Sequence, residues 1–402
     1  MFTKTARGAL VAFTLSVAFV SGNAAADWYE SLSTSVKESS VAFDFRFRNE
    51  TADLATFADQ ARVSTLRSRL TWTSAGLGLW AYGVEADYVT VVGSERYNSL
   101  SNGMTRYPVI ADPEGFDLNR LFLKYAGEDL TGTLGRQRIN HDRQRFVGGV
   151  AWRQNEQSME GVRIEYGKQT KLEYAYVSRI NRIFGPDDGV QPRQWDSDSH
   201  FVRGSVQLAK AHTVTGFGYL MDFENGNGVP NSNATLGVEY TGGFGPFKLA
   251  AALAHQSDVG NSPLDYSAPY YFVEAKVSIG HIGMTAGHEV LGSDEGNAGF
   301  RTPLATLHKF QGWADVFLGT PATGVKDSYL GMSAKVGKAT LAVIYHAFAP
   351  YEGGADYGDE IDVVVNFPLH KALKLQLKYA SYSAESFSVD TEKLWASVRL
   401  TL

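Results

Sequence analysis

Arginines spaced two residues apart are the most chemically distinctive feature of this sequence. Arg46 and Arg48 alternate with phenylalanines, and Arg67 and Arg69 are flanked by leucines. A guanidinium binds a carboxylate through paired hydrogen bonds, and several guanidiniums on one surface raise the local concentration of anions. The chemistry that these residues suggest is therefore the weak, exchangeable binding of anionic solutes.

Residues for bond-making chemistry form no complete site. The chain has no cysteine and no Gly-x-Ser-x-Gly segment, and its nine histidines are scattered. His141 beside Asp142, and His308 together with Asp315, resemble halves of a hydrolase site, but no nucleophile accompanies either pair. We therefore expect no catalytic residue, no metal site and no cofactor.

The start of the chain has the pattern of an export signal. Basic residues come first, an apolar stretch follows at 9–20, and small residues stand at positions 24 and 26. This order is typical of a secretory signal peptide. We expect residues 1–26 to be removed after Sec-type export, which leaves a mature chain of residues 27–402.

Apolar and polar residues alternate along most of the mature chain. A period of two places the two kinds of side chain on opposite faces of a β-strand. The pattern predicts eighteen strands, or sixteen if the poorly alternating segments 130–138 and 212–222 are not strands. The expected strands lie at 41–49, 61–73, 77–90, 117–126, 130–138, 159–167, 171–180, 199–209, 212–222, 234–241, 246–256, 269–279, 281–290, 325–336, 338–347, 358–367, 371–382 and 391–402.

Short and long connections alternate between these strands. The long ones lie at 91–116, 139–158, 181–198, 257–268 and 291–324. In outer-membrane barrels short turns face the periplasm and long loops face outside, and the mature chain has no apolar run long enough for a membrane helix. The sequence therefore predicts an all-β protein, a transmembrane antiparallel barrel in the outer membrane of a Gram-negative bacterium.

The cost of exposing arginine to lipid, about 2–4 kcal/mol at the bilayer midplane, decides which face of each strand is the lumen. The apolar face then meets lipid, with members such as Phe43, Phe45, Phe47, Leu66, Leu70, Tyr329, Leu341 and Val343. The charged face supplies the predicted pore-lining and solute-binding residues, which are Arg46, Arg48, Arg67, Arg69, Arg120, Lys124, Arg136, Arg138, Arg163, Arg203, Lys374, Lys378, Arg399, Glu85 and Asp87.

Two loop segments resemble the alginate-export family of outer-membrane proteins. One contains Gly-Arg-Gln-Arg-Ile at 135–139 and Trp-Arg-Gln-Asn-Glu at 152–156, and the other reads Thr-Pro-Leu-Ala-Thr-Leu-His-Lys-Phe-Gln-Gly-Trp-Ala-Asp at 302–315. The resemblance implies an eighteen-stranded monomeric barrel with an electropositive pore for a polyuronate. It also implies that loops fold into the lumen, with constriction residues Asp142, Arg145, Trp152, Arg153, His308, Trp313 and Asp315.

These observations predict a channel that passes an anionic solute, a uronate-type saccharide or another small carboxylate, through an arginine-lined lumen. The expected partners are outer-membrane lipid and lipopolysaccharide, the solute, and the barrel assembly machinery during biogenesis, and we expect no nucleic acid. Two alternatives stay open. One is a barrel enzyme such as a hydrolase, and the other is a surface-binding barrel that does not conduct.

Overall fold

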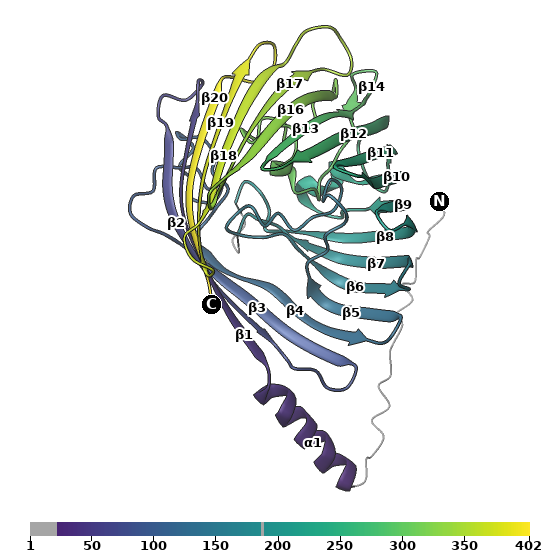
Figure 1. Ribbon diagram of the computed structural model, residues 1–402. Helices are drawn as coiled ribbons and strands as arrows, with labels where there is room; N and C mark the ends of the chain where they lie inside the picture. Colours follow the sequence, from purple (N-terminus) through teal and green to yellow (C-terminus); the bar gives the residue numbers. More distant parts are fainter. Residues whose placement is uncertain (1–21, 186–188) are drawn as a thin grey trace, which may run out of the picture.

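Eighteen antiparallel strands form one closed sheet in the computed structural model, which describes residues 22–185 and 189–402. Each strand pairs with the next one in the barrel, and β20 pairs with β1 to close it (Figure 1). The strands are β1 (Ser40–Leu54), β2 (Ala61–Thr73), β3 (Trp80–Val91), β4 (Gly115–Ala126), β5 (Leu130–Gln137), β6 (Ser158–Tyr166), β7 (Thr170–Asn181), β8 (Gln194–Ala209), β9 (His212–Met221), β10 (Asn233–Phe244), β11 (Phe247–Asp258), β12 (Ser267–Ile279), β13 (Ile282–Leu291), β16 (Val325–Val336), β17 (Ala339–Ala349), β18 (Gly358–Pro368), β19 (Leu373–Ala384) and β20 (Thr391–Thr401).

Few other elements accompany the barrel. The helix α1 (Gly22–Lys37) precedes β1 and projects away from the wall (Figure 1). The short strands β14 (Ser293–Asp294) and β15 (Ala298–Gly299) pair with each other, and two 3-10 turns, η1 (Gly226–Asn231) and η2 (Leu307–Lys309), lie in loops. In the described parts of the chain, no helix combines the length and the apolar character needed to cross a membrane.

The strand predictions are confirmed, including the two doubtful ones, which are β5 and β9. The alternation of short and long connections is confirmed as well. The helix α1 was not predicted, because no apolar pattern marks it. Of the predicted signal peptide, residues 1–21 lie outside the described part of the chain, and residues 22–26 form the start of α1.

The prediction of the lipid face holds for most strands but is wrong for Tyr329. Phe43, Phe47 and Leu70 are exposed on the outside, whereas the arginines between them are buried. The hydroxyl of Tyr329 instead donates to Glu274 Oε2 at 2.9 Å on the lumen side. Tyr329 lies two residues after Asp327 on β16, so both side chains are on the same face of the sheet. The charge of Asp327 therefore indicated the lumen side correctly, whereas the aromatic ring of Tyr329 had suggested the lipid side.

The hydrophobic core of this molecule lies inside the barrel. Apolar side chains of the loops between β5 and β6 and between β13 and β16 pack against inward-facing residues of the wall. Phe146, for example, contacts Phe217, Tyr270 and Phe300 with ring centroids 5.0, 5.2 and 6.0 Å apart. The lumen is therefore filled by packed loops over part of its height, and is not an open pipe.

A charge placed on the outer face tests the orientation of the wall. Leu253 lies in the middle of β11 with 62% of its surface exposed, so Leu253→Arg is expected to lower the free energy of unfolding by about 2–4 kcal/mol. The measurement is urea unfolding in lipid vesicles. Ser333→Arg, on the lumen side of β16, is the control and is expected to change the stability little. Equal losses at both positions would contradict the assignment of the two faces.

Candidate functional site

Two loops meet inside the barrel and define the candidate site. Loop A (residues 138–157) follows β5, and loop B (292–324) follows β13. Their backbones join where Gly148 N donates to Leu304 O at 2.8 Å and Thr306 N donates to Gln144 O at 3.0 Å. The prediction that both segments fold into the lumen is confirmed. The two loops form a single plug, because each supplies backbone partners to the other.

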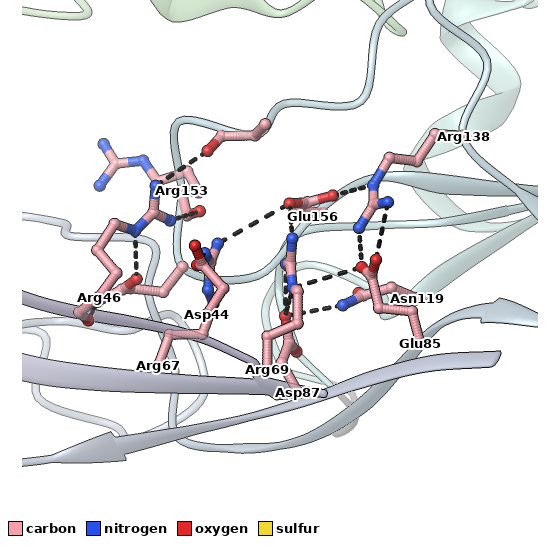
Figure 2. Close-up of polar contacts among 12 residues, drawn as sticks. Asp44, Arg46, Arg67, Arg69, Glu85, Asp87, Asn119, Arg138, Arg153 and Glu156 are labelled. Carbon is pink, nitrogen blue, oxygen red and sulfur yellow. Dashed lines mark hydrogen bonds and ion pairs between the residues drawn. The ribbon is translucent and has the colours of Figure 1, made fainter. Parts of the chain in front are cut away.

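Four arginines of β1 and β2, here called the arginine wall (Arg46, Arg48, Arg67 and Arg69), face this plug. Figure 2 shows Arg46, Arg67 and Arg69. The strand register places Arg46 directly opposite Arg67 on β2 and Arg399 on β20. Like charges opposite each other destabilise a sheet unless they are offset. Asp44 offsets two of them, because it forms an ion pair with Arg67 and accepts from Arg399 Nε at 2.6 Å.

Glu156 of loop A is the main partner of the arginine wall. Its carboxylate forms ion pairs with Arg69 and Arg138 and lies 3.8 Å from Arg67 Nη1 (Figure 2). Burial alone raises the pKa of Glu156, but the ion pairs with Arg69 and Arg138 outweigh burial and hold the pKa to about 2. Glu156 is therefore charged at neutral pH and fixes loop A to the wall.

Arg46 holds loop A in a different way. Its Nε donates to Gln154 Oε1 at 2.8 Å, its Nη1 donates to Ala151 O at 3.1 Å, and its Nη2 donates to Arg153 O. The side chain of Gln154 in turn donates to Thr65 Oγ1 at 2.8 Å. Arg46 thus binds the loop through neutral acceptors, and no carboxylate in the described chain forms an ion pair with it.

The prediction that the arginine wall lines an open pore needs correction. All four side chains point inward as expected, but all four are buried, with Arg48 and Arg67 the most deeply so. Arg46 and Arg48 also line the edge of a cavity at the periplasmic end. The sequence placed these arginines on one wall correctly, but it could not show that loop A packs against them.

Loop B is fixed to β18, three strands from β1 around the barrel. The backbone N–H groups of Trp313 and Ala314 donate to Asp362 Oδ2 at 3.1 Å and Glu360 Oε1 at 2.6 Å on β18. Gly312, with a φ of +76°, packs against the Glu360 carboxyl group, where a side chain would collide with it. This turn holds Trp313 at the centre of the barrel.

Aromatic rings from both loops surround one lysine amino group between the outer and inner cavities. Trp152 of loop A stacks on His308 of loop B, with ring centroids 4.2 Å apart. Lys378 of β19 places Nζ 2.6 Å from His308 Nε2, 3.6 Å from the Trp313 ring centroid and 4.3 Å from that of Trp152. The guanidinium carbon of Arg48 lies 4.2 Å from the ring centroid of Trp152. We call Trp152, His308, Trp313 and Lys378 the constriction.

A polar chain extends from the constriction towards the outside. His308 Nδ1 lies 2.7 Å from Asp315 Oδ1, and Asp315 Oδ2 accepts from Arg153 at 3.2 Å and from Lys393 at 3.1 Å. Burial lowers the pKa of His308 to about 3 in spite of Asp315. The imidazole is therefore neutral. With its proton on Nδ1, it donates to Asp315 and accepts from Lys378 at Nε2.

Strained backbone is concentrated in the same two loops. Val150 has a φ of +51°, and Gln311 and Asp315 have φ values of +49° and +60°. A β-branched residue in this region is a genuine outlier, and such conformations cost about 1–3 kcal/mol each. The constriction is therefore held in place against local backbone preferences.

Three cavities meet at Trp152. The outer cavity, about 580 Å³, is bounded by Trp152, His308 and apolar side chains of the extracellular loops such as Phe184. The inner cavity, about 570 Å³, is lined by the whole constriction and by Gln376. The basic cavity, about 470 Å³, also touches Trp152 and opens near the periplasmic turns. The Trp152 and His308 rings thus separate the outer space from the inner ones.

The basic cavity has the strongest uniform charge. Its lining includes five cationic residues and no acidic one, and all of its lining residues lie in the described chain. Arg48 and Arg399 have carboxylate partners, at 3.6 and 2.6 Å, whereas Arg46, Lys338 and Lys374 form no ion pair with described residues. A cavity of this composition can hold an anion without removing an existing partner.

The other predicted residues lie on the lumen side but are mostly paired with acids. Arg136 binds Glu160, Arg163 binds Glu173, and Arg203 binds Asp142. The remaining contacts join Arg138 to Glu85, Arg120 to Glu85, Arg69 to Asp87, Arg145 to Glu289, and Arg153 to Glu50, whereas Lys124 has no ion pair within the described chain. These pairs form a structural network around the loops, so they are not free pore charges.

Several residues of the site were not predicted. Lys393 and Trp395 have the same parity as the predicted lumen residue Arg399 on β20, so the alternation could have identified them. Glu156 was recognised only as part of a family motif. Its role as the central anion of the arginine wall has no local signal in the sequence, because its partners lie on other strands.

Three buried histidines inside the barrel bond to carboxylates or to a lysine. His141 contacts Glu173, His308 contacts Asp315 and Lys378, and His346 contacts Asp327. No Ser or Thr hydroxyl of the described residues bonds to any of these three imidazoles. In residues 22–185 and 189–402 there is also no group of three or more His, Asp or Glu side chains placed to hold a metal ion.

Solved structures show the same architecture. The chain superimposes on OccAB4 of Acinetobacter baumannii with a TM-score of 0.69 and 14% identity, covering 91% of this chain and 98% of that one. For OccK3 (OpdO) of Pseudomonas aeruginosa the TM-score is 0.71 and the identity 14%, over 93% of this chain and 98% of that one. For OpdK of Pseudomonas aeruginosa, solved with vanillate, the TM-score is 0.72 and the identity 13%, over 91% of this chain and 99% of that one. At this identity the likeness establishes the fold.

A closed eighteen-stranded barrel with loops folded into a charged lumen defines a porin-like channel of the outer membrane. A comparison with curated protein sequences finds no significant match. The family model described as alginate export matches residues 37–261, which is more than half of the chain. The chain belongs to the alginate export family, as the two loop segments indicated.

Removal of the Glu156 charge is expected to free loop A. Breaking a buried ion pair costs about 3–5 kcal/mol, so Glu156→Gln should give a noisier and larger single-channel current in planar bilayers. Because the folded pKa is about 2, below the ordinary 4.5, docking is complete above pH 4.5 and weakens as the pH falls towards 2. Wild type at pH 2 should therefore approach the variant. The control is Glu128→Gln, in an exposed turn, and a quiet wild-type current at pH 2 would contradict the prediction.

Truncation of Trp152 is expected to join the outer and inner cavities. Trp152→Ala removes the ring that three cavities share, so the single-channel conductance should rise severalfold. The matched control is Trp80→Ala, which removes an indole from the outer face of β3, where the side chain is half exposed. An unchanged conductance in Trp152→Ala would show that the partition lies elsewhere.

Proposed function

We propose that this channel conducts an anionic solute, either a uronate-type saccharide or another small carboxylate. The observation that carries the proposal is the basic cavity, where Arg46, Lys338 and Lys374 have no carboxylate partner in the described chain. A carboxylate would exchange among these cations through charge-assisted hydrogen bonds. Each contact remains weak enough for release because several sites share the solute.

Two further findings support a carboxylate. The family to which the chain belongs is described as alginate export, and alginate is a polyuronate. One protein with the same fold, OpdK, was solved with vanillate, which is also a carboxylate. The expected partners are therefore outer-membrane lipid and an anionic solute, and we also propose that residues 1–26 are removed as a signal peptide and that the barrel assembly machinery inserts the chain.

Ion selectivity in planar bilayers tests the proposal. Lys338→Gln/Lys374→Gln removes two unpaired charges from the basic cavity and is expected to lower the anion-to-cation permeability ratio obtained from the reversal potential. The effect should be large at 0.1 M salt, where the Debye length is about 10 Å, and small at 1 M, where it is about 3 Å. Folding is checked by heat-modifiable migration on gels.

The matched control is Lys168→Gln/Lys210→Gln, which removes the same charge from other periplasmic turns. A wild-type channel that prefers cations would refute the proposal. A permeability ratio that falls equally in both double variants would show that the basic cavity is not the selective element. Absence of any current would favour the surface-binding barrel.

A further inference from the structure

Lys378 is a residue of the wall that contacts both infolded loops. It lies on β19, and its ammonium group contacts His308 and Trp313 of loop B and Trp152 of loop A. The side chain is almost completely buried. One flexible lysine side chain thus joins the two loops to β19 between the outer and inner cavities.

The partners of Lys378 are all neutral. His308 is a neutral imidazole, and the two tryptophans offer only the faces of their rings. No carboxylate of residues 22–185 and 189–402 forms an ion pair with Lys378, whereas its neighbours Arg153 and Lys393 both bind Asp315. A charge-assisted hydrogen bond is roughly twice as strong as a neutral one, so a carboxylate would be a better partner than the present ones.

The basic cavity and the inner cavity share lining residues close to this amino group. Lys378 lines the inner cavity, and Gln376, two residues earlier on the same face of β19, lines both the inner and the basic cavity. Two residues of a strand span roughly 7 Å, which is about the length of a small carboxylate. Lys374, Gln376 and Lys378 follow one another at two-residue intervals on the same face of β19, so an anion at Lys374 is separated from Lys378 by one intervening residue of that face.

The closed arrangement is also poised to change. Val150 lies two residues before Trp152 in a backbone conformation that β-branched residues rarely adopt, and Asp315, the partner of His308, has a φ of +60°. Relief of this strain favours movement of the loops once their contact with the wall is lost. The fixed wall does not need to deform, because the contact is a side chain with a flexible four-carbon stem.

We propose that Lys378 is the solute-sensing residue of the channel. A solute carboxylate binds Nζ, replaces His308 as its hydrogen-bond partner and draws the ammonium group from between Trp152 and Trp313. The stacked Trp152 and His308 rings then separate, and the channel opens in response to the anion that it conducts. This inference rests on the proposed anion channel and assigns one residue the role of coupling solute binding to opening.

The experiment measures open probability in planar bilayers containing the full chain. Sodium glucuronate replaces sodium chloride stepwise at constant ionic strength. In wild type the open probability is expected to rise with glucuronate and then saturate. In Lys378→Met, which keeps the stem between the two indoles, the half-saturating concentration should rise roughly tenfold or more, as expected for loss of one hydrogen bond to a charged group.

Two controls separate sensing from folding and from general charge. Lys335→Gln removes a cation from the lumen side of β16, away from the loops, and should leave the glucuronate response unchanged. Lys378→Arg keeps the cation and should retain a response. Heat-modifiable migration on gels reports folding, and Lys378→Gln replaces the Met variant if that variant does not fold.

The outcomes distinguish this inference from the proposed function. A glucuronate response in Lys378→Met equal to that of wild type would overturn the sensing role. A wild-type channel that prefers anions but shows no glucuronate-dependent opening would overturn it as well, and would leave the anion channel intact. A reversal potential showing cation preference would instead remove the proposed function on which the inference rests.

Discussion

A charged side chain on a membrane-spanning strand must face the lumen, and the rest of this structure depends on that constraint. The strand register brings Arg46, Arg67 and Arg399 directly opposite one another across three neighbouring strands. Such a row is stable only with partners, which Asp44 and loop A supply. Exclusion of charge from lipid therefore creates the binding surface that draws a loop into the barrel.

The two infolded loops give the barrel an interior. Strand pairing alone closes the wall, but the aromatic cluster around Phe146 and the junction at Gly148 and Leu304 exist only because the loops meet each other inside. The loops contain strained residues close to the constriction, whereas every strand of the barrel is paired on both sides. Elements that move are expected to belong to the less stable part of a fold, which here is the plug.

The placement of partners separates structural cations from functional ones. Arg69, Arg138 and Arg153 have carboxylates at ion-pair distance and hold the loops. Lys338 and Lys374 form no ion pair with described residues and line the basic cavity, and Lys378 contacts only uncharged groups beside the inner cavity. A solute that passes through weak, repeated sites needs cations of the second kind, because a paired cation has little to gain from another anion.

The sequence by itself determined the barrel, its strands and the inward aim of the arginines. An alternation with period two is a local property, and the lipid penalty converts it directly into an inside and an outside, as at Arg46 between Phe45 and Phe47. Tyr329 was assigned to the lipid face because of its aromatic ring, without regard to a charged residue, and that assignment was wrong. The family motifs added the expectation that loops enter the lumen.

Only the tertiary structure decided which cations are free. Glu156 lies 87 residues from Arg69 in the chain, and loop B brings His308 against Trp152 and Lys378 from a different part of the sequence. No local period encodes such contacts, because they depend on how two long loops fold against each other and against the closed wall. The sequence therefore predicted a charged lumen, whereas the fold decided where that charge is buried, where it is paired and where it remains open to a solute.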